Sequence, residues 1–80
     1  MFPNPSESFA SVDFVLDNDK SIKISVFDAS GKLVAILYNG EAKQGRNVCG
    51  FSTLSLSSGM YFVVIESDTE RLKTHKLSVL

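Results

Sequence analysis

The side chains best suited to catalysis are scarce in this 80-residue sequence. His75 is the only histidine and Cys49 is the only cysteine. Nucleophilic catalysis needs a nucleophile, a base within hydrogen-bonding reach and a third group that orients the base. We expect His75 to be an ordinary strand residue and Cys49 to be a small, partly buried side chain beside Val48. The sequence therefore predicts no catalytic residue and no internal disulfide.

Carboxylates could supply acid–base chemistry or a metal site, and the candidates are Asp17, Asp19 and Asp28. All three lie where the chain is expected to turn, and short carboxylate side chains there accept hydrogen bonds from nearby backbone. The segment 17–19 lacks the glycine and the further ligands of a calcium loop, so calcium binding is only the alternative interpretation. One cysteine and one histidine do not make a zinc site. We expect no metal and no cofactor.

The glycines and aromatic residues give little sign of a ligand site. The five glycines are scattered along the chain rather than gathered in a phosphate-binding loop. Sugar binding favours exposed planar aromatics, and tryptophan is absent. Phe14, Phe51 and Phe62 follow core-type patterns, which leaves three aromatics as carbohydrate platforms. These are Phe27, Tyr38 and Tyr61.

Charge and composition exclude several classes of partner. Eight Lys and Arg residues against nine Asp and Glu residues give a formal net charge of -1, so no basic field attracts nucleic acid or an anionic membrane. No apolar run is close to the length of a membrane helix, which is about 20 residues. The first fifteen residues lack the pattern of a signal peptide. We expect no membrane insertion, and we expect any export signal to lie on further sequence.

The elements that must position these residues follow a period of two. In the first such segment Ala10, Val12 and Phe14 alternate with Ser11 and Asp13, which is typical of a strand with one face on a core. We predict strands at 9–16, 21–28, 33–38, 46–52, 60–66 and 71–80.

The predicted turns and the apolar content suggest how these strands pair. The first two segments should form a hairpin around 17–19. Gly31 and the Asn39-Gly40 dipeptide should mark later turns. The segment 33–38 is apolar almost throughout, so we expect it to be covered on both faces or near the middle of a sheet.

Short strands with turns at this spacing and no helical segment predict an all-β fold. The most consistent architecture is an antiparallel immunoglobulin-like β-sandwich of six to seven strands, with a small barrel as the alternative. Hydrophobic residues make up 44% of the chain, and its length allows a single core. We expect a single domain at 9–80, preceded by a proline-stiffened lead-in at 1–8.

Four segments, in order, resemble the C-terminal sorting domain of the type IX secretion system. The first three carry the family's Pro-Asn-Pro opening, its Asp-x-x-Gly turn and its Leu-x-x-Gly-x-Tyr segment, and the fourth is similar to its closing strand. The residues are Pro3-Asn4-Pro5, Asp28 with Gly31, Leu56 with Gly59 and Tyr61, and Lys76-Leu77-Ser78-Val79-Leu80. Met60 departs from the usual valine, and no basic residue follows Val79.

The resemblance implies a sorting label that directs an upstream passenger domain, in cis, through the periplasm to the cell surface or medium. Its partners would be the outer-membrane translocon and a cell-surface sortase. Asp28, Gly31, Gly59 and Tyr61 would hold the fold. The closing strand 76–80 would be read by the translocon, because an edge strand exposes backbone groups to strand addition; a purely structural edge strand is the alternative.

A related framework occurs in immunoglobulin-like domains of flagellar hook-capping proteins and in appended domains of secreted hydrolases. Under that alternative the chain would be a non-catalytic accessory module that binds carbohydrate or protein.

Overall fold

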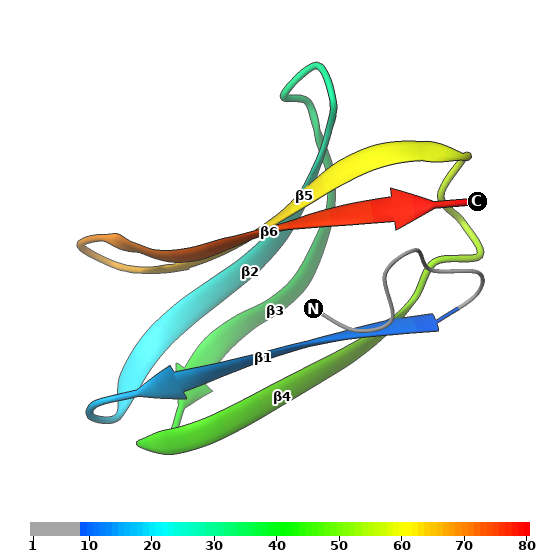
Figure 1. Ribbon diagram of the computed structural model, residues 1–80. Helices are drawn as coiled ribbons and strands as arrows, with labels where there is room; N and C mark the ends of the chain where they lie inside the picture. Colours follow the sequence, from blue (N-terminus) through cyan, green and yellow to red (C-terminus); the bar gives the residue numbers. More distant parts are fainter. Residues whose placement is uncertain (1–8) are drawn as a thin grey trace.

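Residues 9–80, which the computed structural model describes, form six strands in an all-β fold (Figure 1). This confirms the predicted fold class and the lower of the two predicted strand numbers. The strands are β1 (Phe9–Leu16), β2 (Lys20–Asp28), β3 (Leu33–Ala42), β4 (Gly45–Ser52), β5 (Gly59–Ser67) and β6 (Arg71–Val79).

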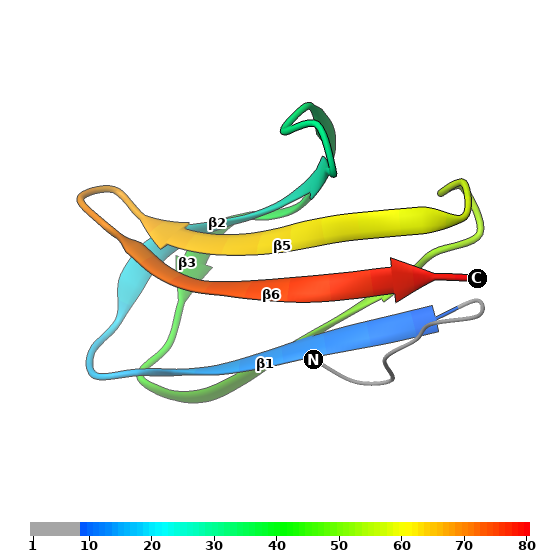
Figure 2. The same cartoon turned by 45° about the horizontal axis from the view of Figure 1, so that its top comes forward.

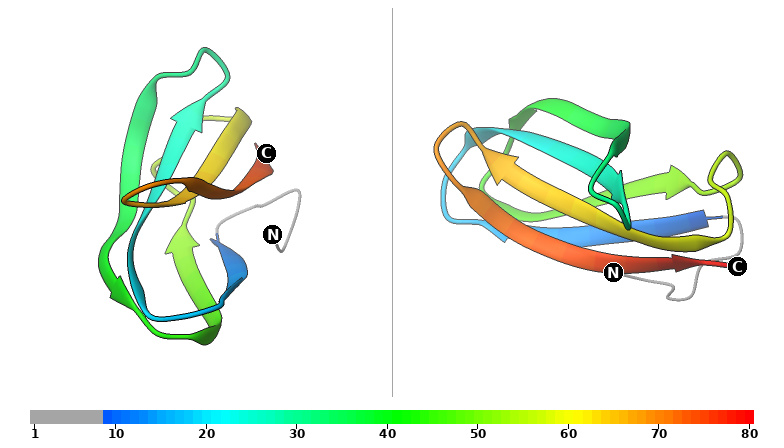
Figure 3. Two further views of the ribbon diagram at one scale, coloured as in Figure 1. Left: turned by 90° about the vertical axis from the view of Figure 1, so that its left-hand side faces the viewer. Right: turned by 90° about the horizontal axis from the view of Figure 1, so that it is seen from above.

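The strands form two antiparallel sheets that face each other. One sheet has four strands in the order β3-β2-β5-β6, and the other contains β1 and β4 (Figures 1 and 3). The predicted hairpin of 9–16 with 21–28 is wrong, because β1 pairs with β4 along its whole length, from Phe9 opposite Ser52 to Leu16 opposite Gly45. The turn after β1 instead carries the chain into the other sheet.

Asp19 ties this crossing to the turn between β3 and β4. Its carboxylate accepts a hydrogen bond of 2.7 Å from the backbone N–H of Gln44 and lies 3.7 Å from the ammonium of Lys43. Asp17 forms a separate ion pair of 3.0 Å with Lys20. The carboxylates of this turn therefore have structural partners, but these are two lysines and the backbone of a distant turn, whereas the sequence analysis predicted bonds to nearby backbone.

β3 lies at an edge of the four-stranded sheet, so its predicted place near the middle is wrong. Its side chains include Leu33 and Ile36, which are about half exposed at 48% and 52%. The predicted turn at Asn39-Gly40 is also wrong, because the strand continues to Ala42. Apolar content alone does not distinguish an edge strand from a covered one, since sheet position depends on partners far away in the chain.

The core lies between the sheets. The predicted alternation is confirmed, since the apolar residues of β1 and β2 point inward together with those of the last two strands. The buried set is Ala10, Val12, Phe14, Leu16, Ile22, Ile24, Val26, Ala42, Phe51, Tyr61, Val63, Ile65, Leu77 and Val79.

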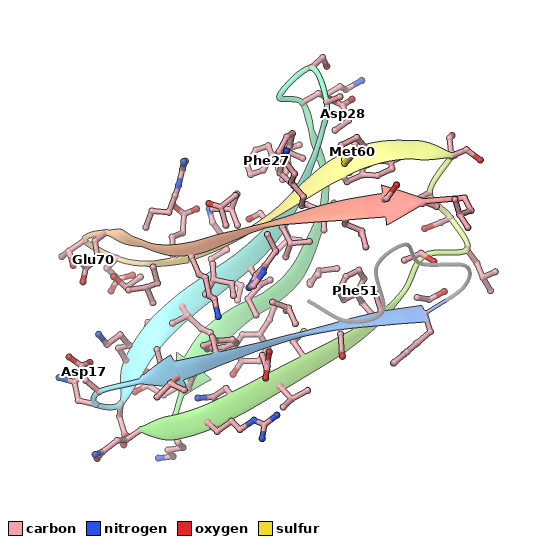
Figure 4. All side chains as sticks on the ribbon, in the orientation of Figure 1. Asp17, Phe27, Asp28, Phe51, Met60 and Glu70 are labelled. Carbon is pink, nitrogen blue, oxygen red and sulfur yellow. The ribbon has the colours of Figure 1, made fainter. Side chains whose placement is uncertain are left out.

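The outer face of the four-stranded sheet is also partly apolar, which the sequence patterns did not reveal. Phe27 pairs with Leu33 on one side and with Phe62 on the other, so the three side chains share this face. Near them Val64 is only 5% exposed. Figure 4 shows Phe27 close to Met60 of β5, on the side away from the smaller sheet.

Ile24→Val should lower the free energy of unfolding by about 1 kcal/mol, because it removes a methyl group from the closed inner face. The same change at the exposed Ile36 should cost about 0.5 kcal/mol or less. Urea unfolding of the two variants measures both values. Equal losses would contradict the assignment of these residues to an inner and an outer environment.

Candidate recognition strand and its supporting corner

The turn between β2 and β3 is organised by the carboxylate of Asp28. Oδ1 of Asp28 accepts hydrogen bonds from the hydroxyl of Ser30 at 2.7 Å and from the backbone N–H groups of Ser30 and Lys32, both at 3.0 Å. The backbone N–H of Gly31 donates to the carbonyl of Asp28 at 3.0 Å. Gly31 has φ of 89°, a conformation that favours glycine. The predicted turn is therefore confirmed.

These hydrogen bonds favour the charged form of Asp28. The hydroxyl of Ser30 and then the backbone N–H of Lys32 lower the pKa of this carboxyl below its ordinary value. Because the bonds connect residues of one turn, the side chain stabilises the local backbone.

Tyr61 anchors the entry into β5. Its ring is only 8% exposed, and its hydroxyl donates a hydrogen bond of 2.7 Å to the carbonyl of Ser57. The bond fixes the loop that precedes the strand, in the manner of the tyrosine corner of immunoglobulin-like sandwiches. Leu56 of the same loop packs against the core. Gly59 has φ of 153°, a backbone conformation that residues other than glycine rarely adopt.

Motifs that are far apart in the sequence meet in one corner of the four-stranded sheet. Asp28 lies directly opposite Tyr61, and Tyr61 lies opposite Leu77 of β6. Gly59 lies opposite Val79. The three motifs therefore form neighbouring positions across β2, β5 and β6, and the corner supports the end of the last strand.

β6 is the other edge of the four-stranded sheet (Figure 2). The buried side chains of Leu77 and Val79 fix β6 to the core. Lys76 is exposed, and Leu80, the residue that follows the strand, is 67% exposed. Its register with β5 is unbroken over 73–79, and the shift in this pair lies earlier, between Ile65 and Glu66. The predicted recognition segment is thus a regular edge with an anchored inner face.

Comparison with known proteins identifies the family of this chain. A family model described as the secretion system C-terminal sorting domain matches residues 1–80. The chain belongs to this family. Searches of curated proteins and of solved structures gave no significant match.

The sorting domain is the C-terminal signal for the type IX secretion system, and it implies export to the cell surface or the medium. A sorting signal of this kind is non-catalytic. The family's Pro3-Asn4-Pro5 opening, predicted from the sequence, lies outside the described residues.

Two polar residues of β6 face inward, a feature that the sequence analysis missed. His75 lies opposite the fully buried Val63 and Lys73 opposite the fully buried Ile65, so both side chains are on the inner side of the sheet. The ammonium of Lys73 donates to the backbone carbonyl of Asp13 in β1 at 3.5 Å. The sequence did contain a signal for this: the alternation that places Leu77 and Val79 on the inner face, continued toward the start of the strand, places His75 and Lys73 on the same face.

His75 is held in a setting that disfavours its charged form. Its Nε2 atom is buried and has no hydrogen-bond partner among the described residues. Burial lowers the pKa of His75 below its ordinary value, and the nearby charge of Lys73 acts in the same direction, against a smaller opposing effect of Asp13. The neutral imidazole is therefore a packing group on the inner face of the edge strand.

Cys49 and Tyr61 pack against the core, whereas Tyr38 is partly exposed. Cys49 is half-buried, which raises the pKa of its thiol and disfavours the reactive thiolate. It lies at a groove of about 410 Å³ between β3 and β4 whose lining includes Phe14 and Tyr38. The hydroxyl of Tyr38 donates to the carbonyl of Glu41. Tyr61, one of the predicted sugar platforms, is buried and does not offer an open ring face.

Within residues 9–80 no three His, Cys, Asp or Glu side chains lie close enough together to hold a metal ion. The same residues contain no helix with the length and apolar character needed to cross a membrane.

Asp28→Ala should lower the midpoint of urea unfolding at neutral pH, because three hydrogen bonds to the carboxylate are lost. The folded-state pKa of Asp28 lies below its unfolded value. Its contribution is therefore complete above about pH 4 and is lost as the pH falls through the folded value. The difference in urea midpoint between the variant and the wild type should therefore become smaller in acid. Asp68→Ala, in the exposed β5–β6 turn, is the control, and an equal effect there would contradict the role of Asp28.

His75→Gln should make the free energy of unfolding less sensitive to pH between about 7 and 5. The folded-state pKa of His75 is depressed, so the unfolded chain takes up the proton first and the wild type loses stability as the pH falls through the unfolded value. Urea titrations at several pH values measure this slope. An unchanged slope in the variant would show that other groups cause the loss.

Proposed function

We propose that the segment Lys76 to Leu80, the C-terminal half of β6 and the residue after it, is the part of the sorting domain that the outer-membrane translocon reads. The observation that carries this proposal is the position of β6. Among the described strands it neighbours β5 alone, so it is the terminal strand of its sheet. Addition of a strand from the translocon to this edge would give main-chain hydrogen bonds without disturbing the core.

The shape of the segment supports recognition by strand addition. Leu77 and Val79 are held in the core, and the motif corner fixes the neighbouring strand through Tyr61. The edge is therefore ordered before the partner arrives, which reduces the conformational entropy lost on binding. The side chains of Lys76 and Leu80 are exposed at the surface.

The rest of the proposed pathway concerns the protein to which the label is attached. An upstream passenger in cis would be delivered by the domain at 9–80, with the lead-in at 1–8 as the junction. A cell-surface sortase would act at or before this junction, because proteases favour accessible connecting segments. The passenger's own activity is separate from the sorting function.

Removal of residues 76–80 should abolish export. The full chain and the shortened chain are fused behind a fluorescent reporter with an ordinary export signal, in a bacterium that has the type IX machinery. We expect the reporter with the full chain in the medium or on the surface and the shortened one in the periplasm. The deletion also removes buried Leu77 and Val79, so folding needs its own control.

Leu16→Ala is the matched control, because it removes a buried side chain from β1, far along the chain from the recognition segment. Both variants are purified, and their stability is compared by urea unfolding. Export of Leu16→Ala together with retention of the deletion supports the proposal. Export of the deletion overturns it, and so does equal retention of two variants of equal stability, since the fold as a whole would then be what the machinery requires.

A further inference from the structure

We infer that the groove between β3 and β4 is a docking site, which receives an extended segment of another polypeptide as a third strand of the smaller sheet. The side chains that this segment turns toward the groove are apolar and uncharged. The site lies at a different edge from β6, so the inference goes beyond the proposed function and does not depend on it.

The two sheets differ in their number of strands. The larger sheet has four strands and the smaller sheet has two among residues 9–80, so the smaller sheet covers only part of the larger one. β3 and β4 diverge from the turn that joins them (Figures 1 and 3). Tyr38 of β3 lies opposite the buried Ile24, on the inner side of the sheet, yet it is 40% exposed. This side of the sandwich is therefore open.

The groove runs along the edge of β4. Its lining includes four consecutive residues of this strand, 47–50. Successive side chains of a strand point to opposite faces, so a hollow bordered by all four residues touches the edge of the strand and not one face alone. Among the described strands β4 pairs only with β1. The groove therefore offers backbone groups that an extended chain can pair with, in addition to side-chain contacts.

The interior of the groove is apolar. Phe14 of β1 lines it together with Ile22 and Ile24 of β2, and Ala42 and Cys49 complete this surface. The volume of about 410 Å³ has the size of pockets that hold small ligands and is too small for a folded domain. A strand that enters the groove should therefore present an apolar side chain at every second residue.

The charges at the groove oppose each other. Its lining contains one acidic and one basic residue, Glu41 and Lys43. The carboxylate of Glu41 accepts a hydrogen bond of 3.1 Å from the hydroxyl of Ser21. The ammonium of Lys43 lies 3.7 Å from the carboxylate of Asp19. A charged side chain that entered the groove would lose hydration without a new opposite charge to pair with, so the groove complements uncharged residues.

The other edge of the smaller sheet is already engaged. The ammonium of Lys73 in β6 donates to the backbone carbonyl of Asp13 in β1 at 3.5 Å, which joins this edge to the larger sheet. β4 is therefore the edge of the smaller sheet at which a further strand can be added.

A second copy of the chain does not fit the groove through the same strand. Pairing of β4 with its own counterpart about a twofold axis would place each β4 beneath the larger sheets of both copies. The space next to β4 on that side is filled by the core of its own copy, which includes Phe51. The two larger sheets would therefore overlap.

The lead-in at 1–8 is also a poor occupant. It joins the chain at Phe9 of β1, and β1 pairs with the edge of β4 that faces away from the groove. Pro3 and Pro5 have no backbone N–H, so two of these eight residues cannot donate to a neighbouring strand. A segment of a different protein, free of proline and alternately apolar and polar, fits the groove better.

A peptide titration tests the inference. The probe is a blocked seven-residue peptide in which threonine alternates with valine, and it is added to the isotope-labelled full chain. We expect NMR shifts and slowed amide exchange at 46–50, with a dissociation constant of about 1 mM or below. Two control peptides should bind at least about tenfold more weakly: one has glutamate in place of valine, and the other has the same residues with the valines in succession.

Cys49 provides a second measurement, because it is the only cysteine and lines the groove. The bound peptide should slow alkylation of its thiol by iodoacetamide about threefold or more, since reactivity depends on access. Cys49→Leu should fill part of the groove and weaken binding of the peptide by about tenfold. Val15→Leu adds apolar bulk to the exposed outer side of the same sheet and should leave binding unchanged.

Urea unfolding of both variants checks that they fold, and alkylation of the wild type decides the matter if Cys49→Leu does not. The site is overturned if the glutamate peptide binds equally well, if the shifts map to β6 or to the outer face of the larger sheet, or if millimolar peptide leaves alkylation unchanged. Export is not measured in these experiments, so such a failure is distinct from a failure of the proposed function.

Two further comparisons identify a different occupant. Faster alkylation of Cys49 after removal of residues 1–8 would show that the lead-in fills the groove. Slower alkylation at high protein concentration, together with a dimer in sedimentation, would show that a second copy does. Either result would overturn the assignment of the groove to a separate polypeptide.

Discussion

The pairing of β2 with β5 is the interaction on which the rest of the structure depends. Seven consecutive residue pairs join the strands, from Ile22 opposite Ser67 to Asp28 opposite Tyr61, and their inner side chains include the fully buried Val63. The two strands are separated by about thirty residues of sequence, so their contact closes a long loop, which costs chain entropy that apolar burial must offset. β3 and β6 then each add to one side of this pair.

The same pairing explains why the family's motif residues stand where they do. Asp28 and Tyr61 end the paired segment, and each holds the backbone of an adjacent connection through hydrogen bonds within its own turn or loop. Their chemistry is local and structural, but its consequence extends to β6, because Leu77 lies opposite Tyr61. A loosened corner would therefore disturb the strand that we propose as the recognition element, even though no corner side chain needs to touch the partner.

The sequence predicted the faces of strands better than their partners. Alternation correctly placed Val12 and Ile24 in the core, because side-chain direction has a period of two whatever the neighbouring strand is. It could not show that β1 pairs with β4 or that β3 lies at an edge, since pairing depends on contacts between distant segments. Lys73 and His75 were missed for a related reason: polar side chains on an inward face break the pattern, and only the register with β5 reveals it.

Inward-facing charge on the edge strand β6 affects which strands can join it. Such a charge normally protects a protein, because a second strand that approached would bury a cation without a partner. In the sorting domain the ammonium of Lys73 donates to a backbone carbonyl of β1, across the seam between the sheets. The bond joins the edge strand of the larger sheet to the smaller sheet, so the lysine contributes to the contact between the sheets as well as to the protection of the edge.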